Sequence, residues 1–162
     1  MNASTISSLK DIKSSSGGVE YVTVLVAGQL LGLPISRVHD VYLVNDITAV
    51  PLAPPEIAGL LNLRGRVVTA VSLRRRLGLN EAAGVDRRMT IGIEHQGEAF
   101  GLLVDDVGEV LRFDPADLQP NPVHLDRRWA SLSNGVYQVD RRLLIILDVD
   151  AVLEFLTEQK AA

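Results

Sequence analysis

The chain has 162 residues, of which 47% are hydrophobic, so it can bury the core of one ordinary domain or of two small lobes. Its formal net charge of -4 at pH 7 argues against a general nucleic-acid binder, because neutralising phosphates requires a basic surface. The absence of cysteine excludes disulfide bonds, thiolate nucleophiles and cysteine-bound zinc.

Residues 1–18 are rich in serine, end in two glycines and contain no apolar run long enough for a secretory signal, so we expect a disordered tail. The longest aliphatic stretches elsewhere, Val67–Val71 and Leu143–Leu147, have the length of a strand and are far too short to span a membrane. The sequence therefore predicts a soluble protein with no direct membrane insertion.

From Glu20 onward, short apolar runs alternate with turn signals, which is typical of an all-β barrel or sandwich. The first such runs are Val22–Val26, Leu30–Leu33 and Val41–Val44. The segment Ile35–Val41 fits both a single helical turn and a bent strand, because its apolar residues recur with a period near three. Only 4% of the residues are aromatic, which favours a core of Val, Leu and Ile.

An internal repeat organises the chain. The segment Gly28–Val44 aligns with Gly97–Phe113 at a constant offset of 69 residues, with identical residues at five positions that include two glycines. Further on, Arg66–Ser72 aligns with Arg142–Asp148 at an offset of 76. The larger offset places an insertion in the second half, near residues 119–134. We interpret this pattern as a duplication.

The repeat predicts two β-lobes, one at about 19–79 and one at about 88–162, joined near 80–87. Neither half buries a generous core alone, so we expect the lobes to share apolar surface. The second lobe should end in a helix that begins after Asp148, which is placed to cap it. Core closure is the favoured role for this helix, over docking to a partner, because its apolar residues form one stripe: Val149, Val152, Leu153 and Leu156.

No pattern of catalytic or metal-binding residues is present in the sequence. The three histidines, His39, His95 and His124, are far apart and lack a partner at metal-ligand spacing, so we interpret each as a surface or turn residue. No phosphate-binding glycine loop or serine nucleophile motif occurs. Asp105 and Asp106 are adjacent, and adjacent strand residues point to opposite faces. We therefore expect no catalytic residue, no metal and no cofactor.

Arginines provide the remaining signal. Arg64 and Arg66 flank a turn glycine, and Arg74–Arg76 crowd one helical turn. Phosphate binding is disfavoured by the acidic total and by the lack of nearby aromatic side chains on which bases could stack. We interpret Arg74–Arg76 as a solvated helix face. Arg64 differs, because a guanidinium group beside a glycine can pair with a carboxylate and still offer donors to a partner.

The run Ile57–Gly65, IAGLLNLRG, followed by a valine-rich strand and Leu73-Arg74, resembles the signature of the CheW family of chemotaxis coupling proteins. Further segments are similar to the family pattern: Tyr21–Val26, Val38–Val41, Ile47–Pro55 and Leu103–Val110. The resemblance implies a mainly β fold of two pseudo-symmetric, five-stranded SH3-like barrels with short helices and a C-terminal helix, extending over residues 19–162.

The resemblance also implies a function. CheW-like proteins are non-catalytic scaffolds that link the cytoplasmic tips of chemoreceptors to the regulatory domain of the histidine kinase CheA. A cytoplasmic protein recruited to membrane-associated receptor arrays is therefore expected, with other CheW-like domains as additional candidate partners. No cofactor and no nucleic acid is implied.

Position by position, Arg64 and Gly65 match the family's arginine and glycine, and Asp40 lies where the family usually has glutamate. We therefore expect an ion pair between Asp40 and Arg64 near the binding surfaces. For the receptor groove we expect apolar residues of both lobes, with ordinary core as the alternative: Ile35, Val38, Val104 and Val107. The chain departs from the family at Asp40, at Thr69, where proline is frequent, and at Ser72, where aspartate is frequent.

Two alternatives remain at the level of sequence. The first is a CheW-like module of another array component, either of the CheV type or a detached CheA regulatory domain. The second is a small β-barrel that binds RNA through Arg64, Arg66 and Arg74–Arg76. Salt distinguishes RNA binding from docking of an apolar groove onto a helix tip. RNA binding falls steeply as ionic strength rises, whereas the docking should weaken only modestly.

Overall fold

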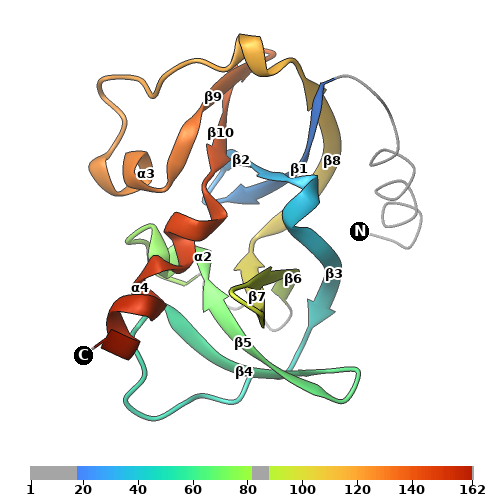
Figure 1. The fold of residues 1–162 in the computed structure, drawn as a ribbon, viewed down its shortest axis with the longest axis vertical. Coiled ribbons are helices and arrows are strands. Elements are labelled where there is room, and N and C mark those ends of the chain that lie inside the picture. The colour runs from blue at the N-terminus through green and yellow to red at the C-terminus, as the bar shows by residue number, and fades with distance from the viewer. Residues whose placement is uncertain (1–17, 82–87, 162) are drawn as a thin grey trace.

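The computed structural model describes residues 18–81 and 88–161, so the expected tail lies outside the described residues except for Gly18. Its strands form two five-stranded sheets (Figure 1). Sheet I contains, in spatial order, β8 (Asp106–Phe113), β1 (Val19–Val26), β2 (Gln29–Pro34), β10 (Arg142–Leu147) and β9 (Ser133–Val139). Sheet II contains β3 (Val38–Val44), β6 (Arg88–His95), β7 (Glu98–Val104), β5 (Arg66–Ser72) and β4 (Ile57–Leu63). The predicted fold class is confirmed.

Short helices connect the strands. The segment from Ile35 to Val41 contains both of the structures left open by the sequence, because the 3-10 helix η1 (Ile35–Arg37) leads directly into β3. The four-residue helix α2 (Leu73–Arg76) follows β5. The extra length of the second half lies between β8 and β9, where the chain forms η2 (Pro115–Asp117) and α3 (Arg127–Ser131). The last element is α4 (Val149–Ala161).

The duplication is visible in the geometry. The turns Ala27-Gly28 and Gln96-Gly97 have nearly the same positive φ angles, 50° and 79° in the first and 50° and 80° in the second. Each tightens a two-residue hairpin, which requires left-handed residues. The parallel strand pairs also correspond. Ala70 of β5 pairs with Gly101 of β7, and Ile146 of β10 pairs with Gly32 of β2, which are the same two positions under the offsets of 69 and 76.

The two lobes are not consecutive halves of the chain. We define repeat 1 as β1 to β5 with α2, and repeat 2 as β6 to β10 with α4. Sheet I combines β1 and β2 of repeat 1 with β8, β9 and β10 of repeat 2, and sheet II has the reverse composition. The expected lobes at 19–79 and 88–162 are therefore wrong as spatial units. The chain passes from one sheet to the other after the second strand of each repeat, so each sheet needs both repeats.

Three apolar clusters hold this arrangement together. The largest lies between the two sheets and includes Val152 and Leu153 of α4, which supports core closure as the role of this helix. In the interior of the barrel formed by sheet I, the rings of Phe113 and Tyr137 stack with centroids 4.3 Å apart, next to Tyr21. The third cluster lies inside sheet II and has smaller side chains: Val44, Leu61, Ala70 and Leu103. The two barrels thus share one core and differ in how their interiors are filled.

Candidate functional site

The turn between β4 and β5 presents Arg64 at the surface. Arg64 and Gly65 have φ angles of 52° and 82°, so both residues are left-handed, as a two-residue hairpin turn requires. The amide of Gly65 donates a 3.1 Å hydrogen bond to Oδ1 of Asn62, which closes the turn from the other side. A β-carbon on Gly65 would meet no atom within 4 Å. The glycine therefore adopts this left-handed conformation without strain, and the turn holds Arg64 in a defined place.

The predicted ion pair between Asp40 and Arg64 is not formed; no salt bridge joins these two described residues. Tyr42 lies between them instead. Its hydroxyl group donates a 2.7 Å hydrogen bond to Oδ2 of Asp40, and Cζ of Arg64 lies 5.8 Å from the centroid of its ring. Aspartate is one methylene shorter than the glutamate usual in the family, and here the tyrosine connects the acid to the base.

The environment of Tyr42 favours its neutral form. Burial, followed by the hydrogen bond to Asp40 and the charge of that carboxylate, raises the pKa of Tyr42 to about 12 from 10.0, while Arg64 and Arg66 oppose the shift. The phenol is therefore a hydrogen-bond donor to Asp40 at neutral pH. The sequence analysis missed this residue, although a tyrosine two positions after Asp40 on a strand must share its face.

A depression of about 480 Å³ lies beside Asp40, Tyr42 and Arg64 in sheet II. Its polar rim combines both signs of charge: His39, Asp40, Arg64, Arg66 and Glu94. Nε2 of His39 lies 3.6 Å from Oε2 of Glu94 across part of this rim.

Sheet I differs at the corresponding place. The repeat alignment puts Leu25 and Leu30 of sheet I at the positions of Glu94 and Ala99 in sheet II, so leucines replace a charged and a small residue. The turn of sheet I that corresponds to Arg64-Gly65 is Asp140-Arg141, also with positive φ angles of 45° and 68°. The two sheets therefore share a turn geometry but present different side chains at it. Sheet II has the Arg64–Tyr42–Asp40 arrangement, and the corresponding part of sheet I does not.

The four residues expected in the receptor groove belong to the core instead. Ile35, Val38, Val104 and Val107 are 5%, 2%, 5% and 9% exposed and all lie in the cluster between the sheets. They occupy the segments in which the chain crosses from one sheet to the other. The groove prediction is therefore wrong for these side chains, because a partner cannot contact them unless the two sheets separate.

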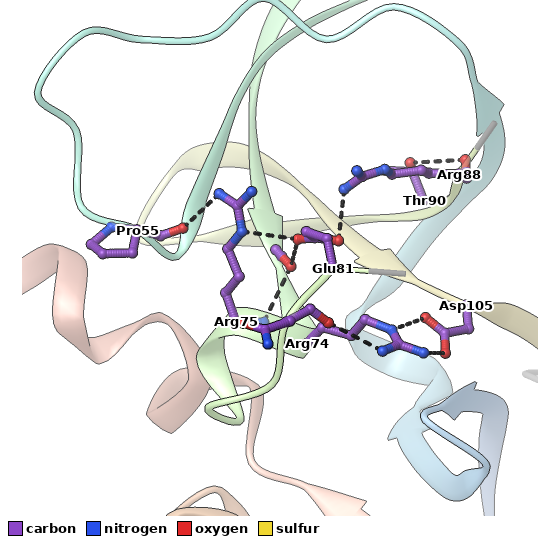
Figure 2. Close-up of polar contacts among 9 residues, drawn as sticks. Pro55, Arg74, Arg75, Glu81, Arg88, Thr90 and Asp105 are labelled. Carbon is purple, nitrogen blue, oxygen red and sulfur yellow. Dashed lines mark hydrogen bonds and ion pairs between the residues drawn. The ribbon is translucent and has the colours of Figure 1, made fainter. Parts of the chain in front are cut away.

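The arginines of α2, Arg74–Arg76, were expected to form a solvated helix face, and they do not. Arg74 pairs with Asp105 through two hydrogen bonds, from Nε to Oδ1 at 2.7 Å and from Nη2 to Oδ2 at 2.6 Å (Figure 2). Arg75 donates to the carbonyl oxygen of Pro55 at 3.0 Å and lies 3.2 Å from Glu81 (Figure 2). These arginines fasten neighbouring segments of the same chain.

Arg76 completes the set. Its guanidinium group donates to the carbonyl oxygens of Ala151 and Val152 at 3.0 and 2.8 Å, and it lies 5.3 Å from the ring centroid of Phe155. It thus anchors α4 against α2. Interpreting Arg74–Arg76 as a solvated face is wrong, and the RNA-binding alternative loses three of its five arginines to internal contacts.

The histidines do not converge. His39 faces Glu94, and Nδ1 of His95 lies 3.2 Å from Oδ1 of Asp150 on α4, while His124 is exposed in the loop before α3. Within residues 18–81 and 88–161, no group of three or more histidine and acidic side chains is placed to hold a metal ion. No helix in this part of the chain is long and apolar enough to cross a membrane.

The sequence model of the CheW-like domain family matches residues 20–156, which is most of the chain. The chain belongs to the CheW family. The chemotaxis protein CheW of Rhizobium meliloti (strain 1021) is 30% identical over 148 residues, covering 91% of this chain and 94% of the relative. The CheW of Bacillus subtilis (strain 168) is 27% identical over 144 residues, covering 89% and 92%.

A solved CheW structure agrees with the fold. The crystal structure of the scaffolding protein TtCheW from Thermoanaerobacter tengcongensis superimposes with a TM-score of 0.74 at 29% sequence identity, covering 85% of this chain and 93% of that one. The resemblance to CheW drawn from the IAGLLNLRG run is thereby confirmed. One departure is also compensated: Oγ of Ser72 accepts a 3.2 Å hydrogen bond from the amide of Arg75, so serine caps α2 as an aspartate would.

Proposed function

We propose that this CheW-family chain is a non-catalytic chemotaxis scaffold that couples the cytoplasmic tips of chemoreceptors to the regulatory domain of the histidine kinase CheA. Family membership and the relatives support this function, since the relatives are chemotaxis proteins and the TtCheW protein is a scaffolding protein. The protein would act in the cytoplasm and be recruited to the receptor arrays at the membrane.

The observation that carries the proposal is the asymmetry between the two sheets. A duplicated fold presents two equivalent turns, and only the turn of sheet II carries an arginine that is joined through Tyr42 to an acid. Residues that serve stability alone would be expected in both repeats. We therefore assign recognition to Asp40, Tyr42, Arg64 and Gly65.

This surface suits a protein partner. Within the described part of the chain, the guanidinium group of Arg64 makes no hydrogen bond, so its donors are available to a carboxylate or carbonyl oxygen of a partner. Tyr42 and Arg64 are the residue types that dominate protein interfaces. The depression beside them gives a partner side chain a place to enter.

The CheA regulatory domain is the partner we assign to this surface, with other CheW-like domains as further candidates for the same contact. For the receptor tip we propose the junction between the two sheets as the docking region. Because Ile35, Val38, Val104 and Val107 lie beneath that junction, they would shape the groove from below without touching the receptor.

The test is calorimetric titration of the chain with the CheA regulatory domain and, separately, with a chemoreceptor cytoplasmic fragment. The informative variant is Arg64→Ala. Its matched control is Arg141→Ala, since Arg141 is an exposed arginine in the corresponding turn of sheet I and also has a positive φ. A Val38→Glu variant would be unsuitable, because it places a charge in the core.

We expect Arg64→Ala to weaken binding to the CheA domain by about tenfold or more, equivalent to roughly 1.4 kcal/mol, and Arg141→Ala to change it by less than about twofold. If the unaltered chain binds neither protein, the proposed function is wrong. If it binds both and the two variants behave alike, the function stands and the assignment of the surface is wrong.

A further inference from the structure

The depression beside Arg64 lies between two hairpin turns of sheet II. Arg64 belongs to the β4–β5 turn and Gly97 to the β6–β7 turn, and both residues line the depression. Its apolar wall includes Val68 of β5 and Ala99 of β7. Its volume of about 480 Å³ lies within the range of about 300–1,000 Å³ in which proteins enclose ligands. The depression can therefore take up a whole side chain of a partner.

The chain fills the equivalent space in sheet I with its own side chains. Under the offsets of 69 and 76, Ala99 corresponds to Leu30 and Val68 corresponds to Leu144. Both leucines pack in the apolar cluster inside the barrel formed by sheet I, and Leu144 is fully buried. The side chain is larger in sheet I at both positions. The duplicated fold thus accommodates leucine here, and sheet II leaves the space open.

A second pair of positions shows the same difference. The rings of Phe113 and Tyr137 stack inside the barrel formed by sheet I. Their counterparts in sheet II, under the same two offsets, are Val44 and Leu61. Leu61 is the cross-strand partner of Val68, which lines the depression. Because aromatic side chains bury more surface than these aliphatic ones, the interior of sheet II is less filled next to the depression.

The rim of the depression carries unpaired positive charge. Arg64 and Arg66 lie on it, and within residues 18–81 and 88–161 neither guanidinium group forms a hydrogen bond or an ion pair. The two acids of the rim already have partners: Asp40 accepts a 2.7 Å hydrogen bond, and Glu94 lies 3.6 Å from His39. The charge left for a partner to neutralise is therefore positive, and a carboxylate is its complement.

We propose that the CheA regulatory domain inserts one apolar side chain into this depression, with a carboxylate beside it that pairs with Arg64 or Arg66. This assignment rests on the function proposed for the chain and names the chemistry of the contact. The apolar wall removes the inserted group from water, and the ion pair at the rim fixes its orientation. Ala99 determines the specificity of the pocket, because its short side chain leaves the space that leucine fills in sheet I.

The test closes the pocket with the residue that the other repeat uses. Ala99→Leu copies Leu30, whose packing shows that the fold accommodates leucine at this position. The matched control is Gln138→Leu, which adds the same side chain at an exposed position of β9 in sheet I. Urea denaturation verifies that both variants fold. In calorimetric titration with the CheA regulatory domain, we expect Ala99→Leu to weaken binding by about tenfold or more and Gln138→Leu by less than about twofold.

The carboxylate is tested through the coupling between Ala99 and Arg64. If one segment of the partner supplies both groups, filling the pocket also moves the carboxylate away from Arg64. Arg64→Ala should then weaken binding by about tenfold in the unaltered chain and by less than about threefold in the Ala99→Leu background. Fully additive effects would show that the two residues contact separate parts of the partner, and they would overturn the proposal.

Hexanoate probes the pocket without CheA, because it combines an apolar chain with a carboxylate. We expect millimolar hexanoate to shift the amide resonances of Gly97 and Ala99 in nuclear magnetic resonance spectra of the unaltered chain. The same addition should leave these resonances unchanged in Ala99→Leu. Hexanol, which lacks the charge, should shift them less.

Failure of the pocket and failure of the proposed function are distinguishable. If Ala99→Leu and the unaltered chain bind the CheA domain equally, the pocket is wrong and the function stands. If the unaltered chain does not bind the CheA domain, the function is wrong and hexanoate decides the pocket: shifts that Ala99→Leu abolishes support it, and absent shifts overturn it. If Ala99→Leu does not fold, Ala99→Val replaces it, with an expected loss of about threefold.

Discussion

Tyr42 and Asp40 are joined by a 2.7 Å hydrogen bond from the tyrosine hydroxyl group to Oδ2 of the carboxylate. Both side chains lie on the face of β3 that borders the depression in sheet II. In the proposed recognition surface, Tyr42 therefore connects the two charges, because Asp40 accepts its hydrogen bond and Arg64 lies against its ring instead of against the acid.

This relationship predicts an unusual tyrosine titration. The pKa of Tyr42 is raised to about 12, so the fold favours the neutral phenol. The associated stability is fully present below the unfolded pKa of 10.0 and is lost as the pH rises toward about 12. The ultraviolet absorbance of tyrosinate, compared between the unaltered chain and Tyr42→Phe, isolates this group. A difference curve with its midpoint at 10 would contradict the arrangement.

The ion pair between Arg74 and Asp105 predicts that the stability of the fold depends on pH in the acidic range. The hydrogen bond from Arg74 lowers the pKa of Asp105 below its ordinary 3.8. The stabilisation is present above pH 3.8 and is lost as the pH falls through the lower, folded pKa. Asp105→Asn should reduce the free energy of unfolding by about 1 kcal/mol at neutral pH, measured by urea denaturation.

The neighbouring Asp106→Asn serves as the control for that measurement, because among residues 18–81 and 88–161 the carboxylate of Asp106 has a local partner only, the amide of Val107. We expect the difference between Asp105→Asn and the unaltered chain to shrink in acid. A difference that stays constant from neutral pH down to about pH 2 would show that Asp105 is not held ionised by its partner.

Two glycines of the β4–β5 hairpin should respond differently to alanine. A β-carbon on Gly59, with φ of 150°, would collide with the carbonyl oxygen of Thr48 and approach Cγ2 of Ile47 to 2.7 Å. Gly59→Ala should therefore cost about 2–3 kcal/mol of unfolding free energy. Gly65→Ala meets no atom and should cost only about 1 kcal/mol, from its left-handed backbone. Equal losses in urea denaturation would refute this distinction.

The serine that replaces the family's aspartate has a specific partner. Ser72 is 1% exposed, and its hydroxyl group donates to Oε1 of Glu81. Ser72→Asp would bring two carboxylates together in a buried place and should cost about 1–3 kcal/mol. Combined with Glu81→Gln, the same substitution should cost much less, because the amide can donate to the new acid. A double-mutant cycle measures this coupling, and additive effects would contradict it.

The sequence predicted the strands, the duplication and the family because these depend on local patterns. The glycines at 28 and 97 mark two-residue turns that only a few residue types can form, and their constant spacing shows the repeat. The partner of each strand was not predictable in this way. Because the two repeats resemble each other, the sequence does not state whether the second neighbour of β2, beside β1, comes from its own half or, as observed, is β10.

The candidate site was predicted in part. Gly65 stands out because a turn with positive φ favours glycine, and Arg64 stands out as its neighbour and as a match to the family's arginine. Ile35 and Val104 were misplaced because an apolar residue on a strand looks the same in a groove and in a core, and only the crossing of the chain between sheets buries them. Tyr42 was missed because its role depends on a contact between β3 and the distant β4–β5 turn.

Co-sedimentation tests the central claim most directly. Membrane vesicles that contain chemoreceptors are mixed with CheA, with or without this chain, and the CheA in the pellet is quantified. A coupling scaffold predicts that CheA sediments with the vesicles when the unaltered chain is added, and much less when it is absent or carries Arg64→Ala. If the amount of CheA in the pellet is the same with and without the chain, the chain does not couple receptors to the kinase.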